Sequence, residues 1–206
     1  MGWPDAVTLA GPQVRLEPLR PDHAAPLATA VADGRLWELW TTSVPTPDGM
    51  AAEIQRRLDL QAQGSMLPFA VVSLAPGPLQ GVPVGMTTYM HTDAANRRLE
   101  IGSTWYRQAV QRTALNTAAK RLLLGHAFDT LGCIAVEFRT HTHNRASRQA
   151  IERLGARLDG VLRSHQVNRH PLAEGSLRDT CVYSITAAEW PTVRVSLDQR
   201  LQHTTR

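Results

Sequence analysis

The stretch from Glu100 to Gly155 constrains the fold of this chain more than any other, because its patterns change from strand to helix twice. Residues Arg98–Trp105 are β-favouring and end in an aromatic residue, which predicts a strand. The apolar residues of Thr113–Leu131 recur at the spacing of one helical face. Cys133–Thr140 is β-branched and aromatic, which indicates a second strand. The stretch is therefore an α/β unit.

Short signals mark the ends of its two predicted helices. Gly132 stands where a C′ residue with positive φ would end the first helix. Asn144 is a typical N-cap for a second helix that runs to Leu154, and Gly155 follows as its end.

The loop before the first helix, Tyr106–Arg112, together with the helix N-terminus predicts an anion site. The first N–H groups of a helix have no carbonyl partner in the helix, and the helix dipole is positive there. Arg112 adds a positive charge. A phosphate or pyrophosphate is the natural ligand of such a site. The alternative is an ordinary βαβ element with a solvated arginine.

Composition limits the class of protein. A chain of 206 residues with 43% hydrophobic and 19% charged residues predicts one globular domain spanning residues 1–206. No apolar run is long enough for a transmembrane helix, and no signal peptide is recognisable at the N-terminus. Two strand-like cysteines, Cys133 and Cys181, are expected to be reduced core residues of a cytoplasmic protein, and no metal-ligand spacing is present.

The net charge of +4 comes from scattered arginines. Because they form no long basic tract, the sequence argues against a nucleic-acid binder. A modest positive field would steer an anionic ligand toward its site.

The remaining segments predict further strands and helices. The expected strands are a hairpin of Val7–Leu9 and Val14–Leu19, then Phe69–Leu74, Val84–Met90, Ala156–Arg163 and Arg178–Ile185. The expected helices are Asp22–Asp33, a helix from Pro47 to Gln63, and a final helix after a capping box formed by Thr186 and Glu189. The final helix either closes the domain or packs on a second subunit in a homodimer.

Several of these segments resemble a known family. The blocks E-I-G-S-T-W, V-Q-R-T-A-L-N and N-R-A-S-R-Q-A-I-E-R-L-G-A occur in the order found in the GNAT acyl-CoA-dependent N-acetyltransferases. The likeness spans about Val14 to about Ile185 and is strongest to the RimJ/RimL-type branch, which acetylates protein N-termini. It implies a twisted, mixed, mostly antiparallel sheet of six or seven strands flanked by helices, with a V-shaped separation between two central strands that holds acetyl-CoA.

The resemblance also implies which residues hold acetyl-CoA. The family's pyrophosphate loop, Q/R-x-x-G-x-G/A, falls on Val110 to Leu115, with Thr113 and Leu115 at positions that are usually small. The residues expected to contact acetyl-CoA are Ile101, Gly102, Ser103, Gln111, Arg112, Thr113, Ala114, Leu115, Asn116, Asn144 and Ser147. The larger residues in the loop motivate one alternative, a non-catalytic acyl-CoA-binding module.

Acetyl transfer to an amine needs a base near the amine, N–H donors near the thioester oxygen and an acid near the sulfur. The resemblance places an acidic residue facing the acceptor at Glu100, which is therefore the candidate base, acting directly or through a water. Alternatively, Glu100 is a strand carboxylate paired with Arg97 or Arg98.

The candidate acid is Ser147, which follows Asn144 by three residues and shares its helix face. Many relatives have a tyrosine acid four positions after Ser147, but this position is Ile151 here. Asn144 would hold the pantetheine arm, act as a plain N-cap, or do both.

The acceptor is expected to be a primary amine, and by resemblance the N-terminus of a protein or peptide. A small amine, such as a polyamine or an aminoglycoside, is the alternative. Trp37 and Trp40 either line the acceptor cleft or pack in the core. The loop His165–Gly175 is a candidate lip of this cleft, with His165 either an alternative base or simply solvated.

Overall fold

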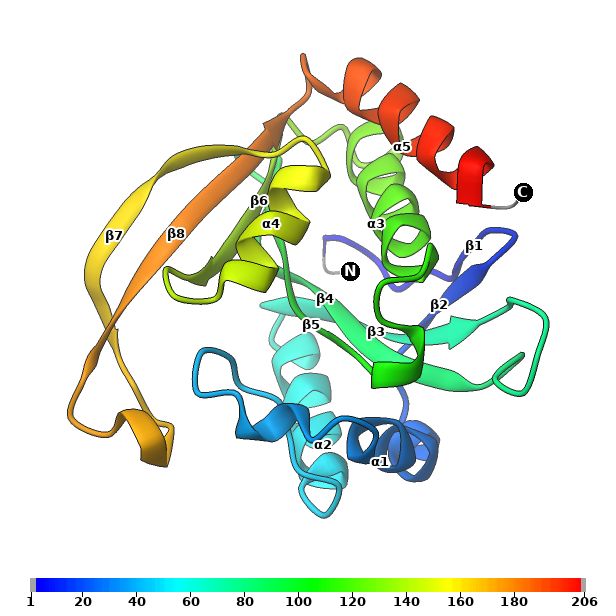
Figure 1. The fold of residues 1–206 in the computed structure, drawn as a ribbon. Helices are drawn as coiled ribbons and strands as arrows, with labels where there is room; N and C mark the ends of the chain where they lie inside the picture. The colour runs from blue at the N-terminus through cyan, green and yellow to red at the C-terminus, as the bar shows by residue number, and fades with distance from the viewer. Residues whose placement is uncertain (1–2, 205–206) are drawn as a thin grey trace.

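An eight-stranded sheet runs through the computed structural model, which describes residues 3–204, in the order β1-β2-β3-β4-β5-β6-β8-β7 (Figure 1). The strands are β1 (Leu9–Ala10), β2 (Val14–Pro18), β3 (Met66–Ser73), β4 (Pro83–Asp93), β5 (Arg98–Tyr106), β6 (Ala135–His141), β7 (Arg157–Val167) and β8 (Leu177–Thr186). All neighbouring strands are antiparallel except β5 and β6. The predicted mixed sheet is confirmed. It has eight strands rather than the six or seven that the resemblance implies, and the extra edge strand is β1 of the predicted N-terminal hairpin.

Helices cover the two faces of this sheet. They are α1 (Ala24–Ala32), α2 (Met50–Ala62), α3 (Leu115–Gly125), α4 (Arg145–Arg153) and α5 (Trp190–Thr204). One apolar cluster joins α1 and α2 to their face, and a larger cluster joins α3, α4 and α5 to the other (Figure 1). Alternate residues of each central strand point into the two clusters, as the two-residue period of a strand requires.

The parallel pair β5 and β6 is short. Only Arg98 to Glu100 pair with β6, opposite Ala135 to Glu137, although both strands continue further. The predicted V-shaped separation is therefore present. Beyond Glu100, no strand within residues 3–204 pairs with the edge of β5 that faces β6.

Local signals account for most element ends. Gly132 and Gly155 adopt positive φ (64° and 98°) where the preceding helices end. α3 continues into a π-helical turn, His126–Thr130, before Gly132. The predicted helix from Pro47 begins only at Met50, because residues 47–49 form a turn. β7 runs to Val167, so the predicted loop His165–Gly175 begins inside a strand.

The C-terminal helix α5 closes the sheet face that carries α3. The Thr186 N–H donates to the Glu189 carboxylate (3.0 Å), which is half of the predicted capping box. Val193 and Leu197 are buried in the larger cluster, and Leu201 packs against it. Among residues 3–204, no helix has the length and apolar character needed to cross a membrane.

Candidate active site

The Glu100 side chain points away from α3. Its neighbours Leu99 and Ile101 are buried in the cluster under α3, so Glu100 and Gly102 face the opposite side of the sheet. The carboxylate lies directly over Gly102, where an added Cβ atom would come within 2.6 Å of Oε1 of Glu100. Because Gly102 has no side chain, the Glu100 carboxylate can occupy this space, at the point where β5 and β6 separate.

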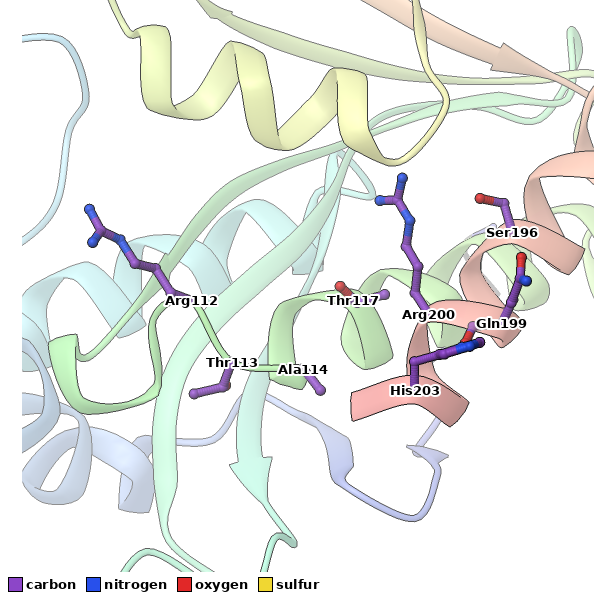
Figure 2. A pocket seen from close by; sticks show the side chains of 8 residues that line it. All are labelled: Arg112, Thr113, Ala114, Thr117, Ser196, Gln199, Arg200 and His203. Atoms are coloured by element: carbon purple, nitrogen blue, oxygen red, sulfur yellow. The ribbon is translucent and has the colours of Figure 1, made fainter. Parts of the chain in front are cut away.

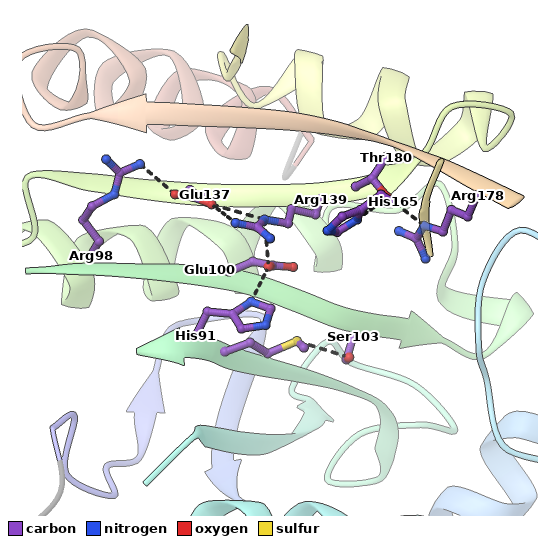
Figure 3. Close-up of polar contacts among 10 residues, drawn as sticks. His91, Arg98, Glu100, Ser103, Glu137, Arg139, His165, Arg178 and Thr180 are labelled. Carbon is purple, nitrogen blue, oxygen red and sulfur yellow. Dashed lines mark hydrogen bonds and ion pairs between the residues drawn. The ribbon is translucent and has the colours of Figure 1, made fainter. Parts of the chain in front are cut away.

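The partners of Glu100 differ from the sequence-based alternative. Its Oε2 is 2.8 Å from Nδ1 of His91 and 3.5 Å from Nε of Arg139 (Figure 3). Arg98 instead bonds Glu137 at 2.7 Å. Neither Arg98 nor Arg97 pairs with Glu100, because pairing with β4 and β6 brings His91 and Arg139 to its face. The hydrogen bond to Glu100 raises the pKa of His91.

A β-bulge distorts β5 just beyond Glu100. Two residues, Ser103 and Thr104, stand opposite Thr87 on β4, and Ser103 adopts a positive φ of 47°. A buried arginine of α2, Arg57, braces this bulge by donating to the Ser103 carbonyl (3.4 Å) and to Thr88 (2.8 Å). The predicted backbone contacts at Ile101, Gly102 and Ser103 therefore lie on an unpaired strand edge, beside a bulge that is held in place.

Lys120 lies on the other side of the same bulge. This residue is buried on α3, and its Nζ donates to the hydroxyl groups of Thr104 (2.8 Å) and Thr87 (3.2 Å). Burial lowers the pKa of Lys120 to about 7. Lys120 was not among the predicted site residues. A signal was present, however, because the only lysine of the chain stands among the apolar residues of a helix.

A pocket of about 610 Å³ lies at the N-terminus of α3 (Figure 2). Arg112, Thr113 and Ala114, all predicted ligands, line it together with Thr117. The opposite wall is a polar stripe on α5, which the sequence analysis missed: Ser196, Gln199, Arg200 and His203. This stripe repeats at helical spacing beside the apolar stripe of α5. The pocket lies at the positive end of α3 and has the basic side chains Arg112, Arg200 and His203 in its lining, which favours an anionic ligand. The Leu115 N–H at this helix end donates to Oγ1 of Thr113 (3.3 Å).

The larger residues of the loop do not fill this pocket. Leu115 is buried in the cluster under α3, and the Thr113 hydroxyl turns back to donate to the Val110 carbonyl (2.7 Å). Three of the residues predicted to contact acetyl-CoA, Gln111, Leu115 and Asn116, do not line this pocket. The Gln111 side chain donates to the Tyr106 carbonyl instead (2.9 Å).

The predicted pair on α4 is adjacent. Asn144 caps the helix, and its Oδ1 accepts from the Ser147 N–H at 3.0 Å. The Ser147 hydroxyl is partly exposed, whereas Ile151 is buried in the core below α4. The plain N-cap role of Asn144 is thus present. α4 and α3 lie on the same face of the sheet, above the separation of β5 and β6 (Figure 1).

A second cleft, of about 740 Å³, opens on the other side of the separation. Its walls are the loop before α2, the end of β6 and the chain between β7 and β8. Trp37 and Trp40 line it. Trp37 also packs against the apolar cluster of α1 and α2, whereas the ring of Trp40 lies against those of His141 and His143 (centroid distances 4.9 and 5.8 Å). The predicted lip contributes residues 166–171. The protein therefore has one basic pocket between α3 and α5 and a second cleft at the ends of β6, β7 and β8.

Comparison with known proteins places this geometry in a family. The family model for an acetyltransferase (GNAT) domain matches residues 13–157. The chain belongs to the GNAT acetyltransferase family. A GCN5-related N-acetyltransferase from Brucella melitensis is 32% identical, with 96% of this chain and 86% of that chain covered and a TM-score of 0.80. No relative is found among curated proteins.

The RimJ/RimL-type resemblance is supported by further structures. RimJ of Mycobacterium smegmatis, in complex with CoA-disulfide, is 26% identical over 97% of both chains, with a TM-score of 0.74. A RimL ribosomal L7/L12 acetyltransferase shares the fold at 16% identity, with 90% of this chain and 97% of that chain covered and a TM-score of 0.73. This GNAT protein is thus an acetyltransferase, and members of the family use acetyl-CoA.

Proposed function

We propose that this GNAT acetyltransferase transfers an acetyl group directly from acetyl-CoA to a primary amine at the N-terminus of a protein or peptide. The observation that carries the proposal is the separation of β5 and β6 just beyond Glu100, with a basic pocket on one side and an open cleft on the other. The two substrates would meet at this separation.

The donor side suits acetyl-CoA. Arg112 and the first N–H groups of α3 would bind the pyrophosphate, with the basic groups of α5 opposite them. The edge of β5 from Ile101 to Ser103 that faces β6 would form backbone hydrogen bonds with the amides of the pantetheine arm, as a neighbouring strand would. Asn144 at the start of α4 would hold the same arm.

The bound thioester supplies an acetyl carbon, to which the amine nitrogen bonds as the carbon–sulfur bond breaks. Glu100 takes the amine proton, directly or through a water, and later releases it to solvent. Ser147 passes a proton to the departing sulfur and regains one from solvent water, so both residues are restored. The bulged strand offers backbone N–H groups to the carbonyl oxygen.

Binding and turnover are tested separately. Calorimetric titration with acetyl-CoA measures binding, and thiol release over a panel of peptides, polyamines and aminoglycosides measures transfer. We expect binding, with the fastest release on peptide N-termini. Binding without release on any amine would refute transfer and favour the non-catalytic module.

The role of Glu100 has its own test. We expect Glu100→Gln to lower kcat by about 100-fold or more, with little change in acetyl-CoA affinity. Glu137→Gln removes the same charge from the neighbouring strand and should keep most of the turnover. Full turnover in Glu100→Gln would exclude this residue as the base.

A further inference from the structure

The cleft on the acceptor side has charge of one sign. Its lining residues include Arg169 and Arg178 but, within the described part of the chain, no aspartate or glutamate. Aromatic and hydroxyl side chains make up most of the loop wall between Trp37 and Val44. A pocket with this lining concentrates anions and repels cations.

His141, at the end of β6, offers this cleft a buried hydrogen-bond donor. The residue is only 3% exposed. Its Nδ1 accepts from the His143 N–H (3.1 Å), so a neutral His141 ring carries its proton on Nε2. Burial, assisted by Arg178 and His143, lowers the pKa of His141 and favours this neutral form, although Asp179 opposes the shift.

The Nε2 atom of His141 has no hydrogen-bond partner among the residues that the structure describes. A buried donor without a partner is uncommon and points to a group that is supplied from outside the fold. Because His141 lines the cleft, this group would be part of the molecule bound there.

Arg178 is positioned beside this donor. Its Nε donates to the Thr180 hydroxyl (3.1 Å), which also bonds His165 (3.1 Å), so the stem is tethered to β8. Figure 3 shows Arg178 and His165 on the same side of the sheet as Glu100. Among the described residues, the two terminal nitrogens of Arg178 have no hydrogen-bond partner, and Glu100 is the carboxylate whose charge acts on the guanidinium. These terminal nitrogens can therefore donate to a ligand, and carboxylates match their geometry.

We propose that the acceptor amine of this enzyme carries a carboxylate, which binds between Arg178 and His141. The inference rests on the proposed acetyl transfer and narrows its substrate class. Two sources share this chemistry, an acidic first residue of a peptide and a free amino acid. Polyamines and aminoglycosides, being polycations, do not fit the cleft.

Matched acceptors test the inference by thiol release with saturating acetyl-CoA. Peptides that begin with Asp or Asn differ in charge at nearly constant shape, and free aspartate is compared with its α-amide. We expect kcat/KM for the Asp peptide to exceed that for the Asn peptide by about tenfold or more if the peptide is the source. A preference confined to the free amino acid identifies the second source.

Variants locate the preference. We expect Arg178→Gln to reduce the ratio between acidic and neutral acceptors toward one, and Arg178→Lys to restore part of it. Arg163→Gln removes an exposed arginine of β7 outside the cleft and should keep the ratio.

The outcomes separate the two proposals. Turnover that does not distinguish acidic from neutral acceptors, or that is fastest with spermidine, would overturn the inference and leave the acetyl transfer intact. An unchanged ratio in Arg178→Gln would overturn the assignment of the carboxylate to this site. No thiol release with any amine would remove the proposed transfer, and the inference with it.

Discussion

The buried Lys120 beneath the bulge allows a quantitative prediction of how the free energy of unfolding changes with pH. Lys120 has two threonine hydroxyls as partners, and its environment lowers its pKa to about 7. The unfolded chain should hold the same proton up to a pH of about 10.4. Between these values the unfolded state binds more protons than the folded state, so this group makes stability rise with pH.

The magnitude follows from the two pKa values. The slope approaches about 1.4 kcal/mol per pH unit, and its integral between pH 7 and pH 9 is about 2 kcal/mol. Below pH 7 both states are protonated, and the contribution becomes constant. A Lys120→Met variant keeps the length of the side chain without the charge, so it should lack this rise.

Urea unfolding of both proteins at pH 7, 8 and 9 measures the difference. The other titrating groups are common to the two proteins. The change with pH of the difference between their unfolding free energies therefore reports the contribution of Lys120 alone. Because the chain has a single lysine, 15N-lysine labelling also gives one side-chain NMR signal whose titration reports the pKa directly. Parallel stability profiles, or a titration near pH 10, would refute the account of a desolvated amine.

Two further substitutions test the geometry of the site. Ser147→Ala should lower kcat with little change in acetyl-CoA affinity, because the backbone N–H that bonds Asn144 is retained; unchanged turnover measured by thiol release would remove Ser147 as the acid. Gly102→Ala should lower turnover by about tenfold or more, because the new Cβ atom would lie 2.6 Å from Glu100 Oε1 and displace the carboxylate that the proposed mechanism needs. Gly160→Ala, where the new Cβ atom meets nothing within 4 Å, is the matched control, and equal activity of the two alanine variants would contradict the assignment.

Local patterns predicted the elements well where one residue sets the backbone. Gly132 and Gly155 end their helices with positive φ, and Asn144 caps α4, because these effects act within a few residues. The predicted start of α2 at Pro47 was wrong, because the helix begins at Met50. The turn after Pro47 delays the helix to Met50, since the proline fixes only its own φ.

Glu100 shows what a sequence pattern leaves open. Its position in a strand and its acidic type were evident, but its partners belong to other strands. His91 contacts Glu100 from β4, and Arg139 contacts it from β6. Short-range sequence patterns do not predict contacts between residues so far apart in the chain. The neighbouring arginines Arg97 and Arg98 were the natural sequence-based choice. They do not pair with it, because strand register, not proximity in sequence, sets side-chain contacts.

The sequence by itself determined the order of strands and helices, the loop with Arg112 before α3 and the family resemblance, because these depend on residue type and short spacing. Only the tertiary structure decided that β5 and β6 separate after Glu100, that Lys120 is buried beneath a bulge, and that α5 faces Arg112. It also brought His141 and Arg178 into one cleft. These features depend on which residues share a face and a register, and such relations arise only when distant segments pack together.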